Sequence, residues 1–456
     1  MTKKYEINMC EGPLFSKLIL FAVPLMLSSI LQLLYNAADV IVVGKFAGHT
    51  ALAAVSSTGS LVNLITNLFI GLSVGANVAT ARFFGAKDDR SVYETVHTSM
   101  LLSIIGGIGV GLIGFFGART FLGWMGSPDD VIDLATLYLK IYFLGMPASM
   151  VYNFGASILR AIGDTRRPMV YLIISGALNV ALNLILVIFF DMGVAGVAIG
   201  TVASQILSAV FAVWTLVRGS DGASFRLYPK QMRVYRDKLN VILRTGIPSG
   251  IQGSVFSLSN VLIQSSINSF GSVAMAGNGA AGNIEGFIYV AMNAFHHAAL
   301  TFTSQNLGAS NIARIKKVFG ACILLVTVIG FALGAAALFF GESLLSIYDS
   351  DPEVIAFGIL RMQIICLTYF FCGIMDVFAG LMRGLGNSVT PMIVSLLGAC
   401  GLRILWIYTI FAMEPTLTCL YISYPVSWVV TSAAHFVCFI LEMRKVERKI
   451  GTKAGG

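Results

Sequence analysis

Twelve long apolar stretches dominate the sequence and decide which folds are open to the chain. Each is about 20 residues long or more, the length that an α-helix needs to cross the hydrocarbon core of a bilayer. Of the 456 residues, 57% are hydrophobic and 11% are charged, whereas soluble domains carry about 25% charged residues. This composition excludes a soluble globular enzyme, a disordered chain and a nucleic-acid-binding protein, and it predicts a polytopic membrane protein.

The predicted spans divide evenly between the two halves of the chain. Nearly all are apolar on every side, as expected of helices that contact lipid or other lipid-embedded helices. The sequence therefore predicts an all-α membrane protein with six spans in each half. The spans are 16–40, 52–76, 94–117, 132–153, 168–190 and 194–217, and then 242–266, 274–301, 318–340, 355–380, 391–412 and 416–441.

Lysine and arginine residues gather in alternate connections between these spans. On the opposite side of the membrane we place only Lys45 and Arg119, and Lys140, Arg361 and Arg403 fall within spans. Because cytoplasmic loops carry the excess of basic residues, both termini are predicted to be cytoplasmic, in the inner (plasma) membrane. This asymmetry explains the net charge of +8, because basic cytoplasmic loops lie next to anionic lipid headgroups. Binding to nucleic acid is not needed to account for the charge.

The two halves of the chain repeat one another. The segment that begins at Arg160 and continues to Pro168-Met169 recurs 223 residues later, from Arg383 to Pro391-Met392. At an offset of 224, Pro24 aligns with Pro248 and Asn36 with Asn260. An even number of spans in each copy makes the repeats parallel, and parallel halves of this kind commonly bind substrate between them.

The repeat sets the predicted domain boundaries. We expect a first lobe at 1–217, a basic cytoplasmic linker at 218–241, a second lobe at 242–441 and a cytoplasmic tail at 442–456. Pro24 and Pro248 lie inside the first span of each lobe, where a proline removes a backbone hydrogen bond and permits a bend. That bend is either static or changes during transport.

Polar residues within the spans are candidates for a binding site, because ionisable groups in a bilayer are costly. In the first lobe, Asn36 and Asp39 share a helix face, and Asn179 and Asn183 lie four residues apart. If these helices are neighbours, the four side chains form a pocket that takes up a proton or Na⁺. The alternatives are an interfacial position for Asp39 and ordinary interhelical hydrogen bonds for the two asparagines.

In the second lobe, the carboxylates of Asp376 and Glu285 are the corresponding candidates, with Gln252 and Asn260 on a neighbouring span. A buried carboxylate suits a proton, Na⁺ or a cationic substrate. The alternative is a structural ion pair with Arg361 or Arg403.

Motifs for nucleotide binding, hydrolysis or a metal centre are not found in the sequence. We expect no catalytic residue, no bound metal and no cofactor other than a coupling ion, H⁺ or Na⁺. Uphill transport then has to draw on an ion gradient.

Motifs throughout the chain, over residues 13–440, resemble those of the MATE (multidrug and toxic compound extrusion) family. The resemblance is carried by Pro24…Asn36-Ala-Ala-Asp39…Gly44-Lys-Phe46, Arg160-Ala-Ile-Gly163-Asp164…Pro168, Asn179-Val-Ala-Leu-Asn183…Gly193-Val-Ala-Gly196, Gln305-Asn306-Leu-Gly308-Ala309 and Asp376-Val-Phe-Ala-Gly380-Leu-Met-Arg383-Gly384.

This resemblance implies a V-shaped, bacterial-type antiporter that exports cationic or amphipathic organic compounds against H⁺ or Na⁺ by alternating access. Asp39 and Asn179 match the family's coupling-ion site in the first lobe, and Asp376 matches an acidic residue tied to cation binding in the second. Two departures favour proton coupling through Asp39: Asn183 stands where many relatives have an acid, and the span from 242 to 266 lacks a glutamate.

Methionine and aromatic residues can adapt to varied ligands, so we expect a substrate cavity lined by Tyr35, Met146, Tyr152, Phe154 and Met292. The expected partners are small organic substrates and membrane lipids, with the protein a monomer. One alternative is a flippase for lipid-linked precursors, whose anionic headgroups need several cationic residues in the cavity. The other is a membrane-embedded transferase, for which the sequence lacks a clustered catalytic His or Asp.

Overall fold

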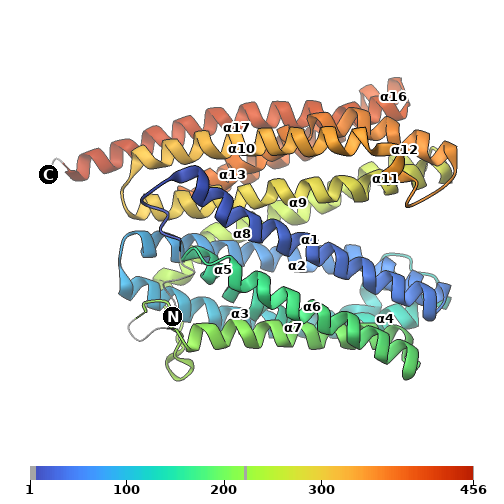
Figure 1. Ribbon diagram of the computed structural model, residues 1–456, viewed down its shortest axis with the longest axis horizontal. Coiled ribbons are helices and arrows are strands. Elements are labelled where there is room, and N and C mark those ends of the chain that lie inside the picture. The colour runs from blue at the N-terminus through green and yellow to red at the C-terminus, as the bar shows by residue number, and fades with distance from the viewer. Residues whose placement is uncertain (1–6, 220–222, 455–456) are drawn as a thin grey trace. The chain divides into compact units, whose positions relative to one another are not determined.

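The described part of the chain, residues 7–219 and 223–454 of a computed structural model, is built from helices and contains no strand. Figure 1 shows long helices, many of which pack side by side with their neighbours. The helices of the first half are α1 (Leu14–Phe46), α2 (His49–Gly85), α3 (Asp89–Trp124), α4 (Asp129–Leu144), α5 (Met146–Ala161), α6 (Arg166–Leu184) and α7 (Gly193–Val217).

The second half repeats this order with more interruptions. Its helices are α8 (Arg236–Asn268), α9 (Ser272–Gly308), α10 (Ile312–Phe339), α11 (Gly341–Leu345), α12 (Pro352–Ile365), α13 (Phe370–Gly384), α14 (Val389–Ser395), α15 (Leu402–Tyr408), α16 (Ile410–Met413) and α17 (Leu417–Ala454).

Two of the predicted spans are broken in the structure. The span predicted at 132–153 consists of α4 and α5, which meet at 47°, and the span predicted at 355–380 consists of α12 and α13, which meet at 45°. Pro147 lies in the first turn of α5, where its missing N–H leaves no backbone hydrogen bond unmade. By length and apolarity, eight described helices can cross a membrane, or ten if each bent pair is one span. The other two predicted spans are α8 and α9.

A π-helical turn interrupts each of two repeat-related spans, at different depths. Ile185–Phe189 follows α6 in the first half, and Leu396–Gly401 follows α14 in the second. A π turn encloses one residue more than an α turn. The turn in the second half comes earlier in its span than the turn in the first half, so the offset of 223 seen at Pro391 is expected to become 224 between the two turns.

The helices form two compact units. One contains Leu27–Gly250, and the other contains Met9–Met26 and the chain beyond Gly250. The boundaries thus fall inside α1 and α8, each two residues after a proline, Pro24 or Pro248. The described residues of the predicted linker, 218–219 and 223–241, group with the first unit.

Small residues allow the helices of each unit to approach closely. In the first unit, Gly114 of α3 packs under the Phe143 ring of α4, where an added Cβ would lie 2.2 Å from ring carbons. In the second unit, Gly334 of α10 approaches the Cys366 carbonyl, 2.1 Å from the position of a Cβ. Helices in lipid associate through such contacts, because the hydrophobic effect does not drive them together there.

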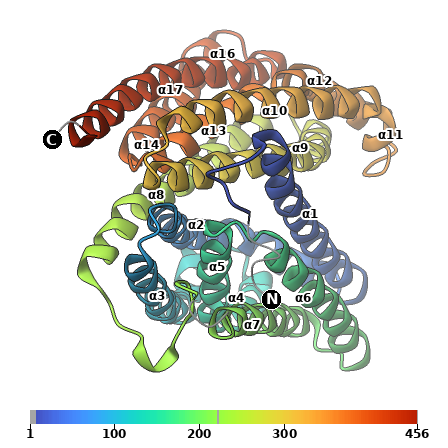
Figure 2. The ribbon, with the colours of Figure 1, turned by 60° about the vertical axis from the view of Figure 1, so that its left-hand side comes forward.

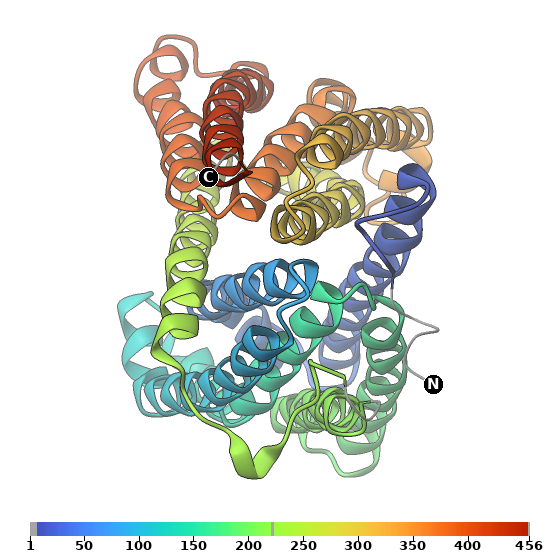
Figure 3. The same cartoon turned by 90° about the vertical axis from the view of Figure 1, so that its left-hand side faces the viewer.

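The linker between α7 and α8 is attached to the beginning of α3 (Figures 2 and 3). Tyr228 donates its backbone N–H to His97 Nε2 at 3.1 Å, and Tyr235 donates its own to Thr98 Oγ1 at 3.1 Å. The other His97 nitrogen, Nδ1, lies 2.8 Å from the Tyr93 carbonyl and donates to it. These bonds satisfy two linker amides that would otherwise lack partners.

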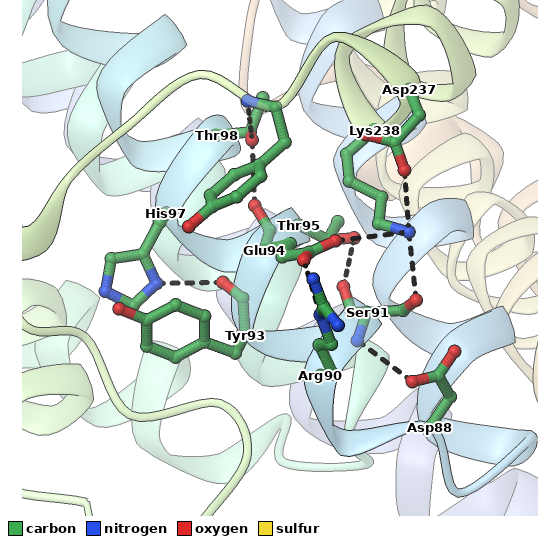
Figure 4. Close-up of polar contacts among 11 residues, drawn as sticks. Asp88, Arg90, Ser91, Tyr93, Glu94, Thr95, His97, Thr98, Asp237 and Lys238 are labelled. Carbon is green, nitrogen blue, oxygen red and sulfur yellow. Dashed lines mark hydrogen bonds and ion pairs between the residues drawn. The ribbon is translucent and has the colours of Figure 1, made fainter.

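Lys238 at the start of α8 completes this attachment (Figure 4). Its ammonium lies 2.9 Å from Ser91 Oγ, 2.9 Å from an oxygen of Asp237 and 3.5 Å from an oxygen of Glu94. The hydrogen bond from Lys238 lowers the pKa of Asp237. At the first turn of α3, the Asp88 side chain accepts the Ser91 N–H at 3.0 Å, and the hydrogen bonds from Ser91 lower the pKa of Asp88.

We predict that Lys238→Met lowers the thermal unfolding midpoint of the purified protein by a few degrees. The reason is that Glu94 and Ser91 lose a buried partner, at a cost of about 1–2 kcal/mol. Lys230→Met, at an exposed linker lysine, is the control and is expected to leave the midpoint unchanged. Equal midpoints for the two variants would contradict the role given to Lys238.

Candidate functional site

Asp39 lies in α1 and is 8% exposed, so its side chain is buried within the protein. Its carboxylate has polar but uncharged partners. Oδ1 accepts a hydrogen bond from Asn183 Nδ2 of α6, and Oδ2 accepts one from Thr201 Oγ1 of α7 at 3.4 Å. Among the described residues, no ion pair includes Asp39. The carboxylate is thus held by dipoles without a fixed cation.

Asn179 lies one turn before Asn183 on α6 and links the two helices that surround Asp39. Its Nδ2 donates to Thr201 Oγ1 at 3.4 Å, and its Oδ1 lies 3.5 Å from Asn183 Nδ2. The remaining amide oxygen, Asn183 Oδ1, is buried and has no hydrogen-bond partner. The cluster therefore gathers carboxylate, amide and hydroxyl oxygens, the ligand types that bind hard cations.

The cluster borders a polar cavity of about 350 Å³ in the first unit. Of the described residues that line it, Asp39 is the only acid, and none is a lysine, arginine or histidine. The remaining lining is mainly amides and hydroxyls, including Gln32, Tyr35, Asn36, Asn63, Thr66, Asn153, Ser204, Gln205 and Ser208. A ligand in this cavity meets one negative charge and many neutral hydrogen-bonding groups.

Two glycines make room for this arrangement. A Cβ on Gly200 of α7 would lie 2.2 Å from Asn183 Oδ1, so only glycine lets that side chain reach Asp39. A Cβ on Gly176 of α6 would lie 1.8 Å from the Tyr35 ring. The hydroxyl of Tyr35 donates a hydrogen bond to the Ile173 carbonyl at 3.4 Å. The sequence thus positions both polar groups by omitting a side chain opposite each.

The structure brings together Asp39, Asn179 and Asn183 as the sequence suggested, and it places Asn36 on the same cavity. Thr201 was missed, although it contacts Asp39 directly. A signal for it was present, because Thr201, Ser204, Gln205 and Ser208 recur at helical spacing on one face of an otherwise apolar helix and all line the cavity.

The five residues predicted to line a substrate cavity are found in different places. Tyr35 and Tyr152 line the cavity beside Asp39. Met146 and Phe154 are buried in the packed cores of the first unit. Met292 is buried in the second unit, where its Sδ lies against Gly330 and Gly373.

The polar candidates of the second unit do not share one set of contacts. Glu285 of α9 pairs with Arg361 of α12, which is one of the alternatives that the sequence left open. Gln252 of α8 accepts a hydrogen bond from Arg383 at 2.8 Å, and Asn260 is exposed.

Asp376 of α13 takes part in a chain of contacts that includes Gln252 and is separate from the Glu285–Arg361 pair. Its carboxylate accepts a hydrogen bond from the Tyr289 hydroxyl, and its backbone carbonyl accepts one from His296 Nδ1 at 2.6 Å. His296 Nε2 lies 3.3 Å from Arg383, whose Nη2 donates to Gln252.

Comparison with known proteins agrees with the internal repeat. The family model described as MatE matches the chain twice, at residues 24–185 and 248–409. The chain belongs to the MatE family. The two matches begin at Pro24 and Pro248, so they reproduce the internal repeat at the offset of 224.

Named relatives cover most of the chain. It is 27% identical over 390 residues to the probable multidrug resistance protein YoeA of Bacillus subtilis, covering 84% of each chain. It is 24% identical over 391 residues to the multidrug export protein MepA of Staphylococcus aureus, covering 85% of each chain.

Solved structures show the same fold. A multidrug resistance MATE family transporter in an outward-facing conformation superposes with a TM-score of 0.90 at 22% identity, over 96% of this chain and 98% of the other. The predicted all-α fold class of the MATE family is thereby confirmed, and the chain is a multi-pass membrane protein.

We predict that Gly200→Ala impairs function more than stability. The new methyl group displaces the Asn183 side chain, which can rotate, so the helix packing survives while Asp39 loses its amide partner. Dye efflux is expected to fall several-fold with a change of only a few degrees in thermal midpoint. Gly109→Ala, where a Cβ meets nothing within 4 Å, is the control. Normal efflux by Gly200→Ala would argue against a role for the Asn183–Asp39 contact.

Proposed function

We propose that this protein exports cationic or amphipathic organic compounds and draws the energy from inward movement of H⁺ or Na⁺ at Asp39. The observation that supports the proposal is a buried carboxylate with no fixed cation, on the wall of a polar cavity. The relatives' names, multidrug resistance and multidrug export protein, give the direction of transport and the broad class of substrate.

The coupling step follows from the cost of burying a charge. An ionised carboxylate in an apolar surrounding is unfavourable unless a cation accompanies it. Asn183 and Thr201 offset part of that cost by hydrogen bonding, and a proton or Na⁺ offsets the rest. Binding or loss of one small cation at Asp39 therefore changes which conformation of the protein has the lower free energy, as alternating access requires.

Exchange of substrate for ion follows from the cavity's single negative charge. A cationic substrate and a coupling cation are both attracted to Asp39, and together they would leave the site with an excess positive charge. Each therefore favours release of the other, which makes the transport an antiport. The surrounding amides and hydroxyls can hydrogen-bond to substrates of different shapes.

An ion gradient supplies enough energy for this exchange. One elementary charge that crosses 100 mV of membrane potential releases about 2.3 kcal/mol, which corresponds to roughly fifty-fold accumulation at one ion per substrate. Of the two ions we favour H⁺ as the coupling ion. A second carboxylate at position 183 would favour Na⁺ binding, but this chain has the neutral amide of Asn183 there. The alternative of a flippase for anionic lipid-linked precursors has no support in the Asp39 cavity, whose described lining lacks any cationic residue.

The location and assembly belong to the same proposal. We place the protein in the inner (plasma) membrane with both termini in the cytoplasm, because all the basic residues in the predicted connections except Lys45 and Arg119 lie on the same side as the termini. It acts as a monomer, with membrane lipids as its surroundings.

We predict that Asp39→Asn lowers the initial rate of ethidium efflux at least about tenfold, while the amount of folded protein stays unchanged. The asparagine keeps the size of the side chain and loses the charge that attracts the ion. Asp133→Asn, at an exposed ion pair with Arg119, is the matched control and retains full efflux. Unaltered efflux by Asp39→Asn would discredit the site.

We also predict that substrate-stimulated proton flux accompanies transport in proteoliposomes. A pH gradient imposed without Na⁺ should drive substrate movement. The Asp39→Asn protein should show neither the substrate-stimulated proton flux nor the substrate movement driven by the pH gradient. If a Na⁺ gradient alone drives transport, the coupling ion is Na⁺. If neither gradient does so, ion coupling is refuted.

A further inference from the structure

Glu285 of α9 and Arg361 of α12 form a buried, bidentate ion pair in the second unit. Arg361 Nε lies 2.8 Å from Glu285 Oε1, and Nη2 lies 2.7 Å from Oε2. Glu285 is 3% exposed and Arg361 is 8% exposed. Parallel hydrogen bonds of this kind are the strongest arrangement that a guanidinium and a carboxylate can make, and here they occupy both carboxylate oxygens.

The rest of the guanidinium is also engaged. Nη1 donates to Asn278 Oδ1 at 2.5 Å, and that oxygen also accepts the Tyr421 hydroxyl at 3.4 Å. The rings of Tyr421 and Tyr424 lie 5.5 Å from the guanidinium carbon, within the range of cation–π attraction. Two helices besides α12, namely α9 and α17, thus supply contacts to Arg361, and its side chain is held in one place.

Arg403, the other candidate partner of Glu285, has different contacts. Its Nε donates to Ser427 at 2.8 Å, and its guanidinium lies over the rings of Tyr424 and Trp428. The choice of Arg361 over Arg403 therefore reflects which helix faces α9.

Asp39 in the first unit provides the contrast. Its partners are an amide and a hydroxyl, and no described cation pairs with it. The repeat shows how the two halves came to differ: at the offset of 224, Asp39 corresponds to Ile263, and at the offset of 223, Tyr138 corresponds to Arg361. The second half lacks the acid on its first span and has a cation on its fourth.

We propose that Arg361 is a tethered counter-cation for Glu285: its guanidinium occupies the place that a mobile cation would take, so that Glu285 neither binds nor releases an ion during turnover. Only its consequence for turnover rests on the proposed ion-coupled transport. The pairing itself can be tested by stability, without any transport.

The stability test uses the Asp39→Asn protein as its background, so that the first-unit site contributes no response. Arg361→Gln leaves Glu285 without its cation, and the thermal midpoint at pH 8 without Na⁺ should fall by about 5–10 °C. Lowering the pH to 6 or adding Na⁺ should restore at least several degrees, because a proton or metal ion then replaces the guanidinium. Glu285→Gln/Arg361→Gln and Arg361→Lys should show no such recovery, since the first lacks the carboxylate and the second keeps a tethered cation.

Several outcomes of this test would overturn the inference. One is a midpoint of Arg361→Gln that is insensitive to protons and Na⁺. Another is an equal recovery in the double variant, which would place the response elsewhere. If Arg361→Gln cannot be purified, Arg361→Lys decides the stability arm: a cation-dependent recovery there would contradict tethering.

The transport arm uses the chain with Asp39 intact. The number of ions moved per substrate should be the same in the unaltered protein and in Glu285→Gln/Arg361→Gln, because the pair carries no ion. A lower ratio in a folded double variant would overturn the inference. An unaltered protein that moves substrate without any ion would instead refute the proposed function, and the stability arm would still decide whether Arg361 is tethered to Glu285.

Discussion

A carboxylate without a fixed cation, Asp39, is the constraint that the first unit is arranged around. Its charge is unfavourable in an apolar helix bundle, and its hydrogen-bond partners are dipoles that lower this cost: the Asn183 amide, the Thr201 hydroxyl and, behind them, Asn179. These groups come from helices α1, α6 and α7, and Gly200 is the residue that lets α6 present its amide. Because these dipoles offset only part of the cost of burying the Asp39 charge, binding of a cation there is still favourable.

The second unit meets the same physical difficulty in another way. Glu285 is also an acid within a helix bundle, but Arg361 compensates its charge completely and permanently. Asn278 accepts a further hydrogen bond from the guanidinium, and the Tyr421 ring lies 5.5 Å from it. Two halves with a common repeat thus have opposite relations to mobile cations, one open and one closed.

The sequence predicted the parts of this picture that depend on periodicity. The spans, the repeat and the pairing of Asp39 with Asn179 and Asn183 followed from apolar length, offset and helical spacing. Thr201 also had a periodic signal, as one of four polar residues on a single face, and could have been found. The partner of Glu285 could not, because Arg361 and Arg403 both lie in spans and only the rotation of each helix decides between them.

The breaks within spans were predicted least well. Residues 132–153 were treated as one helix, although Gly145 and Pro147 stand where α4 and α5 meet. A continuous apolar run does not reveal a bend, because both arms remain apolar. Only the local backbone requirements of glycine and proline carry that information.

The π-helical turn at Leu396–Gly401 has a practical consequence for anyone who exchanges segments between the halves. Between this turn and the one at Ile185–Phe189, an offset of 224 aligns Arg403 with Asn179, whereas the offset of 223 would align it with Val180. A chimera joined by ungapped alignment across this point would rotate the transplanted helix by about 100°, turning its polar face toward lipid. Splice points for such chimeras belong between Arg383 and Pro391, where the offset of 223 from Arg160 and Pro168 is constant.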